Sequence, residues 1–264
     1  MKAILGIDAA WTVKEPSGIA VVAKRLGRWR LLALAPSYTA FLDETLSSQA
    51  SVRHRGTQVE AAHLLERARA IAACDVDLVA IDMPLSEDLI TTRRACDNLV
   101  SSAYGARHCA THTPSAIRPG KISDDIRLGF SRQGYNLLRD RIETPGLMEV
   151  YPHPARVELS RSDRRLPYKA AKVAKYWPDD TPAVRRDSLI GVWHRIVRLL
   201  DAEIDGVHAK MTVPGRDAKG WELKGFEDML DAVVCAWVGI EALEGRAICY
   251  GDNRSAIWIP AARP

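Results

Sequence analysis

Apolar runs separated by turn signals open the chain and predict its first strands. Residues 2–7 are mostly apolar and lead directly into Asp8. A second run covers residues 18–23, and a third covers residues 28–35 and stops before Pro36. β-rich runs bounded by such turn residues are typical of strands joined by short connections. We therefore expect three successive antiparallel strands.

The hydrophobic pattern then changes to a helical period. Between residues 57 and 73, apolar side chains recur every three or four positions, and Thr57 with Glu60 matches a capping box. Residues 76–81 follow as a short, mainly apolar β-type run that ends in Asp82. Such a run is typical of a buried parallel strand. The predicted order to this point is β-β-β-α-β.

The rest of the chain combines helical segments with one further strand. Residues 147–151 form a β-type run that carries Glu149 and predicts a fifth strand. Helical periodicity predicts helices over residues 93–104, 124–141, 188–200 and 226–244. Strands that alternate with helices indicate an α/β fold. We expect one domain over residues 1–264, with a helical and loop insertion at about residues 86–145.

Composition narrows the class of protein. The 264 residues are 47% hydrophobic and 27% charged, as in ordinary soluble globular proteins. The long apolar run of the last helix, residues 232–240, is far shorter than the roughly 20 residues needed to cross a bilayer. Asp8 interrupts the N-terminal apolar stretch before a signal-peptide core is complete. We therefore expect a cytoplasmic protein without a membrane partner.

Cysteine and histidine offer little support for a disulfide framework or a zinc site. The five cysteines are irregularly spaced and include no CxxC pair, so we expect reduced thiols. His108, Cys109 and His112, with Cys96 upstream, are a possible zinc set, but their separation fits none of the usual paired spacings. A zinc site is therefore disfavoured.

Positive charge is concentrated in one part of the chain. The formal net charge is only +4, yet residues 151–200 contain eleven Lys or Arg against five Asp or Glu. Cations such as Lys169 could neutralise the phosphates of a nucleic acid strand, and Tyr168 and Trp177 could stack on bases. A solvated helical face explains the same charges, so both interpretations stay open.

Acidic residues stand at positions where a sheet would bring them together. Asp8 and Asp82 each end a predicted strand, at the edge where side chains converge in open α/β sheets. Asp228 and Asp231 lie three apart in the last helix and therefore share one face. Carboxylates from separate elements can bind Mg²⁺ while leaving positions for phosphate. Individually, Asp8 and Asp82 could instead form turns, and Asp228 could stabilise the start of a helix.

Several motifs together resemble a known family over nearly the whole chain. They are Gly6-Ile7-Asp8-Ala9-Ala10-Trp11, Val79-Ala80-Ile81-Asp82-Met83-Pro84, Arg94-x-Cys96-Asp97, Glu149-Val150-Tyr151-Pro152-x-Pro154 and Asp228-x-x-Asp231-Ala232. The chain resembles the predicted RNase H-like nucleases of domain-of-unknown-function family 429, and the wider superfamily of Holliday-junction resolvases. The resemblance implies an RNase H-like fold, with a five-stranded mixed sheet in the order 3-2-1-4-5, strand 2 antiparallel, and helices on its flanks.

The resemblance also implies a set of site residues. Carried over by position, it implies that Asp8, Asp82, Asp228 and Asp231 are metal ligands and catalytic residues, and that Glu149 is a further ligand or general base. The ions expected are two Mg²⁺ or Mn²⁺, about 4 Å apart. We expect Arg94, Lys169 and His153 to contact the substrate.

These features predict a metal-dependent nuclease that hydrolyses phosphodiester bonds of DNA or RNA. Two alternatives stay open. An actin-like ATPase or phosphotransferase would begin with a similar strand, although it would normally carry further glycine-rich phosphate loops. A nucleic-acid-binding module without catalytic turnover would keep the same fold.

Overall fold

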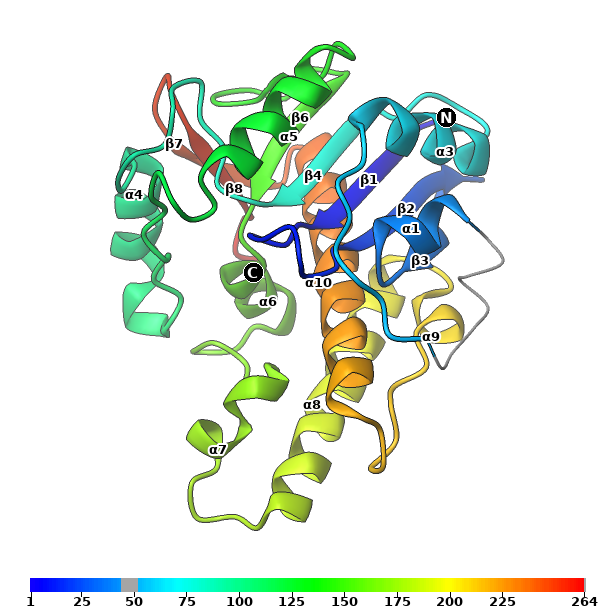
Figure 1. Ribbon diagram of the computed structural model, residues 1–264, viewed down its shortest axis with the longest axis vertical. Coiled ribbons are helices and arrows are strands. Elements are labelled where there is room, and N and C mark those ends of the chain that lie inside the picture. Colours follow the sequence, from blue (N-terminus) through cyan, green and yellow to red (C-terminus); the bar gives the residue numbers. More distant parts are fainter. Residues whose placement is uncertain (44–51, 264) are drawn as a thin grey trace.

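A mixed β-sheet with helices on both faces forms the centre of the molecule (Figure 1). The computed structural model describes residues 1–43 and 52–263. The first strands are β1 (Ala3–Asp8), β2 (Gly18–Arg25) and β3 (Arg28–Ala35), and each pairs antiparallel with the next. These strands confirm the predicted meander.

The central strands run parallel to β1. Strand β4 (Leu78–Asp82) pairs with β1, and β6 (Gly146–Val150) pairs with β4. The sheet order β3-β2-β1-β4-β6 agrees with the order predicted for the first five strands. Because β1 and β4 are parallel neighbours, their last residues lie at the same edge of the sheet.

The sheet extends beyond the predicted five strands. Strand β8 (Ala256–Pro260) pairs in parallel with β6, and β7 (Ala247–Gly251) pairs antiparallel with β8. The two-residue strand β5 (Asn136–Leu137) pairs with the start of β6. The described residues thus form an eight-stranded sheet, and the prediction of five strands was wrong. Strand β5 has only two residues and carries no periodic signal, whereas β7 and β8 are as long as β4 and β6 and were missed although β8 is an apolar run.

The helices agree with the predicted segments except at several ends. The structure contains α1 (Tyr38–Leu42), α3 (Ala61–Ala72), α4 (Ala95–Tyr104), α5 (Lys121–Ser131), α6 (Pro152–Ser160), α7 (Val173–Tyr176), α8 (Pro182–Glu203), α9 (Val207–Lys210) and α10 (Gly220–Leu243), with short 3-10 turns η1 (Gly105–Arg107) and η2 (Ala170–Lys172). Helix α3 begins after Glu60, whose side chain makes no capping bond, so the predicted capping box was wrong. Helix α5 ends ten residues before the predicted boundary, and β5 follows.

Each face of the sheet carries its own hydrophobic core. On one face, Ile4 packs with side chains from α8 and α10, including Trp193 and Trp237. On the other face, Leu5 and Ile7 pack with side chains from α1 and α3. Successive residues of β1 therefore enter opposite cores, as the alternation of a strand requires. A sheet buried on both faces explains the nearly unbroken apolar sequence of β1.

Helix α10 lies against the sheet at very short range. A Cβ atom at Gly6 would overlap the carbonyl oxygen of Ala232, and one at Gly18 would overlap that of Asp228. Glycine at these two strand positions therefore lets the backbones of helix and sheet touch. Since Gly18 is the register partner of Asp8, this contact holds Asp228 of α10 close to the end of β1.

All five cysteines are free, as expected for reduced thiols. Among the described residues, no helix combines the length and apolar character that a bilayer span requires. The predicted insertion, residues 86–145, contains α4, α5 and β5 between strands β4 and β6.

The close approach of α10 predicts opposite effects for two glycine substitutions. Gly6→Ala should lower the free energy of unfolding by about 1–3 kcal/mol, because the new methyl group forces helix and sheet apart. Gly191→Ala is the matched control: its Cβ meets no atom within 4 Å on exposed helix α8, so stability should rise by up to ~1 kcal/mol. Urea unfolding of both variants tests this, and equal stabilities would contradict the packing described.

Candidate functional site

Asp8 and Asp82 lie side by side at the ends of parallel strands. They are register partners in the β1–β4 pair, and both side chains are partly exposed. Within residues 1–43 and 52–263, neither carboxylate makes a hydrogen bond or an ion pair. The sequence prediction that these two acids meet at one sheet edge is therefore confirmed.

The surroundings of this pair disfavour the ionised form of Asp82. Burial, with the adjacent Asp8 as the next cause, raises the pKa of Asp82 to about 8. Glu149 adds to the rise, whereas the positive charges of Lys169 and Arg156 oppose it. A carboxylate with a raised pKa and no protein partner at a strand end is typical of a functional site.

Asp228 joins the two strand aspartates from helix α10. Its side chain is 1% exposed, and one oxygen pairs with Lys224, one helical turn earlier. The other oxygen, Oδ2, is buried and accepts no hydrogen bond from any residue the structure describes. Burial and the charge of Asp8 raise the pKa of Asp228 well above its ordinary value. One oxygen of Asp228 is thus paired with the ammonium of Lys224, whereas Oδ2 has no hydrogen-bond donor within the described ranges.

Asp231 is held differently, by two cations. Its carboxylate pairs with Arg156 of α6, and its Oδ2 lies 2.8 Å from Nζ of Lys169. The hydroxyl of Tyr168 also donates to Oδ2, at 3.4 Å. Because Arg156 and Asp231 are each 1% exposed, this is a fully buried ion pair. Asp231 therefore has partners that Asp8 and Asp82 lack.

Lys169 links the carboxylates of α10 to the strand ends. Its ammonium lies 3.0 Å from Glu227 and 2.8 Å from Asp231. Burial alone would lower the pKa of Lys169, but Tyr168, Glu227 and Asp8 raise it above its ordinary value. Lys169 therefore stays positively charged, and the influence of Asp8 places that charge near the open carboxylate pair.

His153 is buried beside the same network and remains neutral. Its Nδ1 lies 3.0 Å from the hydroxyl of Tyr168, and its ring meets those of Tyr151 and Tyr168 edge-on. Burial lowers the pKa of His153 well below its ordinary value, and Arg165 is the first of several cations that add to this effect. A neutral imidazole can form a hydrogen bond to a substrate but contributes no positive charge.

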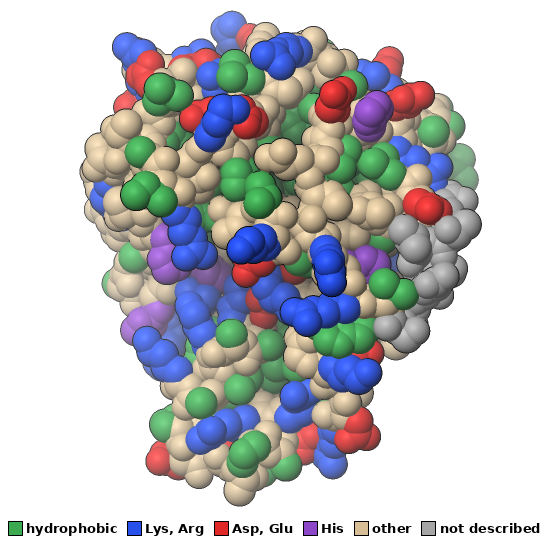
Figure 2. All heavy atoms as spheres, in the orientation of Figure 1, with side chains coloured by type: hydrophobic (Ala, Val, Ile, Leu, Met, Phe, Trp, Pro, Cys, Tyr) green, Lys and Arg blue, Asp and Glu red, His purple; other side chains and the backbone are tan. Residues whose placement is uncertain are grey.

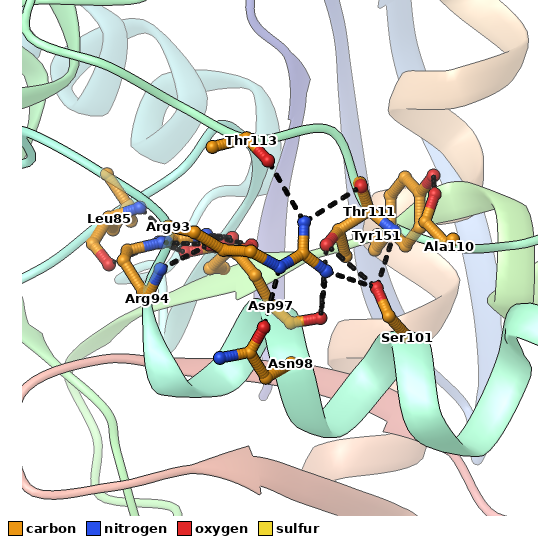
Figure 3. Close-up of polar contacts among 11 residues, drawn as sticks. Leu85, Arg93, Arg94, Asp97, Asn98, Ser101, Ala110, Thr111, Thr113 and Tyr151 are labelled. Carbon is orange, nitrogen blue, oxygen red and sulfur yellow. Dashed lines mark hydrogen bonds and ion pairs between the residues drawn. The ribbon is translucent and has the colours of Figure 1, made fainter.

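Glu149 belongs to an ion-pair network that fixes the insertion to the sheet through Arg94 and Asp97, which Figure 3 labels. Its two oxygens lie 2.6 and 2.7 Å from the guanidinium of Arg94, and Oε2 also accepts a bond from the backbone N–H of Leu85. Asp97 accepts two further bonds from the Arg94 side chain, and the carbonyl of Leu85 accepts another. All five guanidinium N–H groups of Arg94 are thereby used, so it has no donor left for a substrate unless one of these bonds breaks.

The carboxylates do not surround one common empty centre. Among the described residues, no group of three or more His, Cys, Asp or Glu side chains is arranged to hold a metal ion. Asp228 and Asp231 are instead compensated by Lys224, Arg156 and Lys169. The described part of the chain likewise contains no group of Cys and His side chains arranged to hold zinc. Figure 2 shows acidic side chains between Lys and Arg side chains at the middle of this face.

Sequence patterns did not indicate the cations that hold the acids. Arg156 lies in α6, which was not predicted because two prolines stand at its start. Lys224 precedes Asp228 by four residues, and this spacing is a signal for an ion pair that could have been used. The partner of a buried acid can also come from a distant segment, as with Lys169 and Asp231, and spacing carries no information on such contacts.

Comparison with known proteins gives one match. A family model described as "Protein of unknown function (DUF429)" matches residues 6–256. No curated protein and no solved structure matches the chain.

Because Asp231 and Asp8 have different partners, removing the charge of each should change the free energy of unfolding by a different amount. Asp231→Asn should lower the free energy of unfolding by about 3–5 kcal/mol, because Arg156 is left buried without its counter-charge. Asp8→Asn, the matched control, should cost less than ~1 kcal/mol, since this carboxylate has no described partner to lose. Denaturant unfolding without added metal measures both, and a larger loss for Asp8→Asn would contradict the assignment.

The raised pKa of Asp82 predicts a stability that falls with pH. In the unfolded chain Asp82 ionises near its ordinary value of 3.8, whereas in the folded protein it holds its proton up to about pH 8. Folding is therefore favoured at low pH, and this contribution is lost as pH rises from about 4 to 8. In EDTA, Asp82→Asn should flatten this part of the stability profile; an unchanged slope would show that Asp82 is ionised throughout.

Proposed function

The chain belongs to the DUF429 family, and from the geometry of its carboxylates we propose that it is a metal-dependent phosphodiester hydrolase acting on nucleic acid. The observation that carries the proposal is the pair of open carboxylates, Asp8 and Asp82, at neighbouring parallel strand ends. Their position beside buried cations suits a substrate group that is itself anionic. Phosphate is such a group, and it binds well between a metal ion and Lys or Arg.

The topology supports an RNase H-like fold within this proposal. The order β3-β2-β1-β4-β6, with β2 antiparallel, is the arrangement that the family resemblance implies for its first five strands. Asp228 and Asp231 belong to helix α10, which packs against β1 and β2 next to the same strand ends. We propose that β5, β7 and β8 are additions at the far side of that sheet.

Three carboxylates supply the donor chemistry for one divalent cation, although in the structure they do not surround a common centre, so their side chains would have to turn toward the ion. Asp8 and Asp82 offer open carboxylates, and Asp228 offers a buried oxygen without a hydrogen-bond donor. All three are hard oxygen donors of the kind that Mg²⁺ and Mn²⁺ prefer. Such an ion would activate water and neutralise phosphate charge. A second ion on Asp231, as the sequence suggested, would require Lys169 to leave that carboxylate.

The chain's own cations and hydrogen bonds have separate roles in this proposal. Lys169 keeps its charge and would hold a non-bridging oxygen of the scissile phosphate. The Tyr168 hydroxyl and the neutral His153 would orient the attacking water or the leaving group through hydrogen bonds. Arg94 would act indirectly, by fixing Glu149 next to Asp82.

Cleavage of nucleic acid tests the proposal directly. With Mn²⁺ present, the wild type should cleave at least one class of a labelled panel of single-stranded, duplex, hybrid and branched DNA and RNA. Asp8→Asn should reduce the rate on the order of a thousandfold, because it removes a ligand and a negative charge from the open pair. Asp163→Asn, an exposed acid away from the strand ends, is the matched control and should cleave like the wild type.

The same experiment separates the rival functions. Mn²⁺ should raise the melting temperature of the wild type but not of Asp8→Asn. If the metal stabilises the wild type and no substrate is cleaved, the nuclease proposal fails in favour of a nucleic-acid-binding module. Tight ATP binding without cleavage would instead favour a phosphotransferase.

A further inference from the structure

Arg165 is a cation with no counter-charge in the part of the chain that the structure describes. Its Nε and Nη2 atoms are buried, and neither donates a hydrogen bond to any residue the structure describes. The same described ranges contain no ion pair between Arg165 and a carboxylate. Burying two guanidinium nitrogens without acceptors is costly, so Arg165, although half-buried as a residue, points to an anion that binds from outside the chain.

The neighbouring acid Glu158 is already engaged. Glu158 pairs with Arg107 at 2.6 Å, and Arg107 also donates to the carbonyl of Ser162 at 2.7 Å. The backbone N–H of Arg165 donates to the carbonyl of Arg107 at 2.9 Å. Arg107 and Glu158 thus hold the backbone around Arg165 in place, while they neutralise each other and leave the Arg165 charge uncompensated.

Two further side chains, His112 and Lys172, lie within electrostatic reach of Arg165. Burial lowers the pKa of His112, and the charges of Lys172, Arg165 and Arg118 lower it further. Burial likewise lowers the pKa of Lys172, with Arg165 as the first of the cations that add to the effect. Like charges that disfavour one another's protonation are stabilised when an anion binds among them.

The loop that carries His112 is held firmly in position (Figure 3). Arg93 donates to the carbonyl of Thr111 at 3.3 Å and to the hydroxyl of Thr113 at 3.1 Å. The hydroxyl of Tyr151 donates to the carbonyl of Ala110 at 3.0 Å. These bonds flank His112 on both sides and fix the backbone that carries it, while the side chains of His112 and Lys172 themselves are exposed to solvent beside Arg165.

We propose that Arg165, Lys172 and His112 form a second anion site that binds a terminal phosphate monoester of the substrate strand. A monoester carries up to two negative charges, which suits several converging cations better than a singly charged diester. Residues 169–172 connect this site to the carboxylates, because Lys169 pairs with Glu227 and Asp231. That the phosphate belongs to a nucleic acid strand rests on the proposed function.

Binding to oligonucleotides with different ends tests the site without any cleavage. In EDTA, fluorescence anisotropy would compare one labelled single strand that carries a 5′-phosphate, a 3′-phosphate or only hydroxyl ends. The wild type should bind one phosphorylated form about tenfold more tightly than the hydroxyl form. Arg165→Met should reduce this preference to less than twofold. Arg164→Met, which removes an exposed charge one residue away, is the matched control and should keep the preference.

Three outcomes would overturn the inference. The wild type could show no preference for a phosphorylated end, or both arginine variants could lose the preference equally, as expected of a diffuse positive surface. A marked fall in the melting temperature of Arg165→Met would show that Arg165 stabilises the fold through contacts other than a ligand. Because the assay needs no turnover, a protein that selects phosphorylated ends but never cleaves would refute the nuclease and keep the site.

Discussion

The contact between helix α10 and the first two strands is the constraint on which the site depends. Glycine at positions 6 and 18 lets the helix backbone touch the sheet, and this carries Asp228 into the interior beside Asp8. Carboxylates buried in this way need either a cation or a proton. The arrangement of Lys, Arg and raised pKa values around the strand ends follows from that requirement.

The acidic residues at the strand ends fall into two sets, according to whether an arginine neutralises them. Asp231 and Glu149 have arginine partners at close range and help to hold α6 and the insertion in place. Asp8 and Asp82 have no such partners within the described ranges and lie side by side at the ends of parallel strands. We interpret Asp231 and Glu149 as structural residues, and Asp8 and Asp82 as the residues that would bind a metal ion. Asp228 combines both properties, because one of its oxygens pairs with Lys224 while Oδ2 accepts no hydrogen bond from any described residue.

The sequence predicted the elements well where they are long or begin the chain, and less well elsewhere. Asp8 and Asp82 could be paired in advance because strand ends of parallel neighbours must meet at one edge. The two-residue strand β5 gives no periodic signal, and the apolar residues of β8 follow the last helix, where no further strand was expected, so the predicted sheet was too small. The ion pair between Lys169 and Asp231 joins segments 62 residues apart, and no local pattern specifies such a contact.

The central claim is that Asp8, Asp82 and Asp228 can together hold a divalent cation. A crystal structure of the protein soaked in Mn²⁺, with anomalous diffraction data, would locate the metal directly. Our account predicts an anomalous peak about 2–2.5 Å from oxygens of Asp8 and Asp82, with the Oδ2 atom of Asp228 turned toward it. Strand ends without a peak, with Mn²⁺ bound elsewhere or not at all, would contradict the claim.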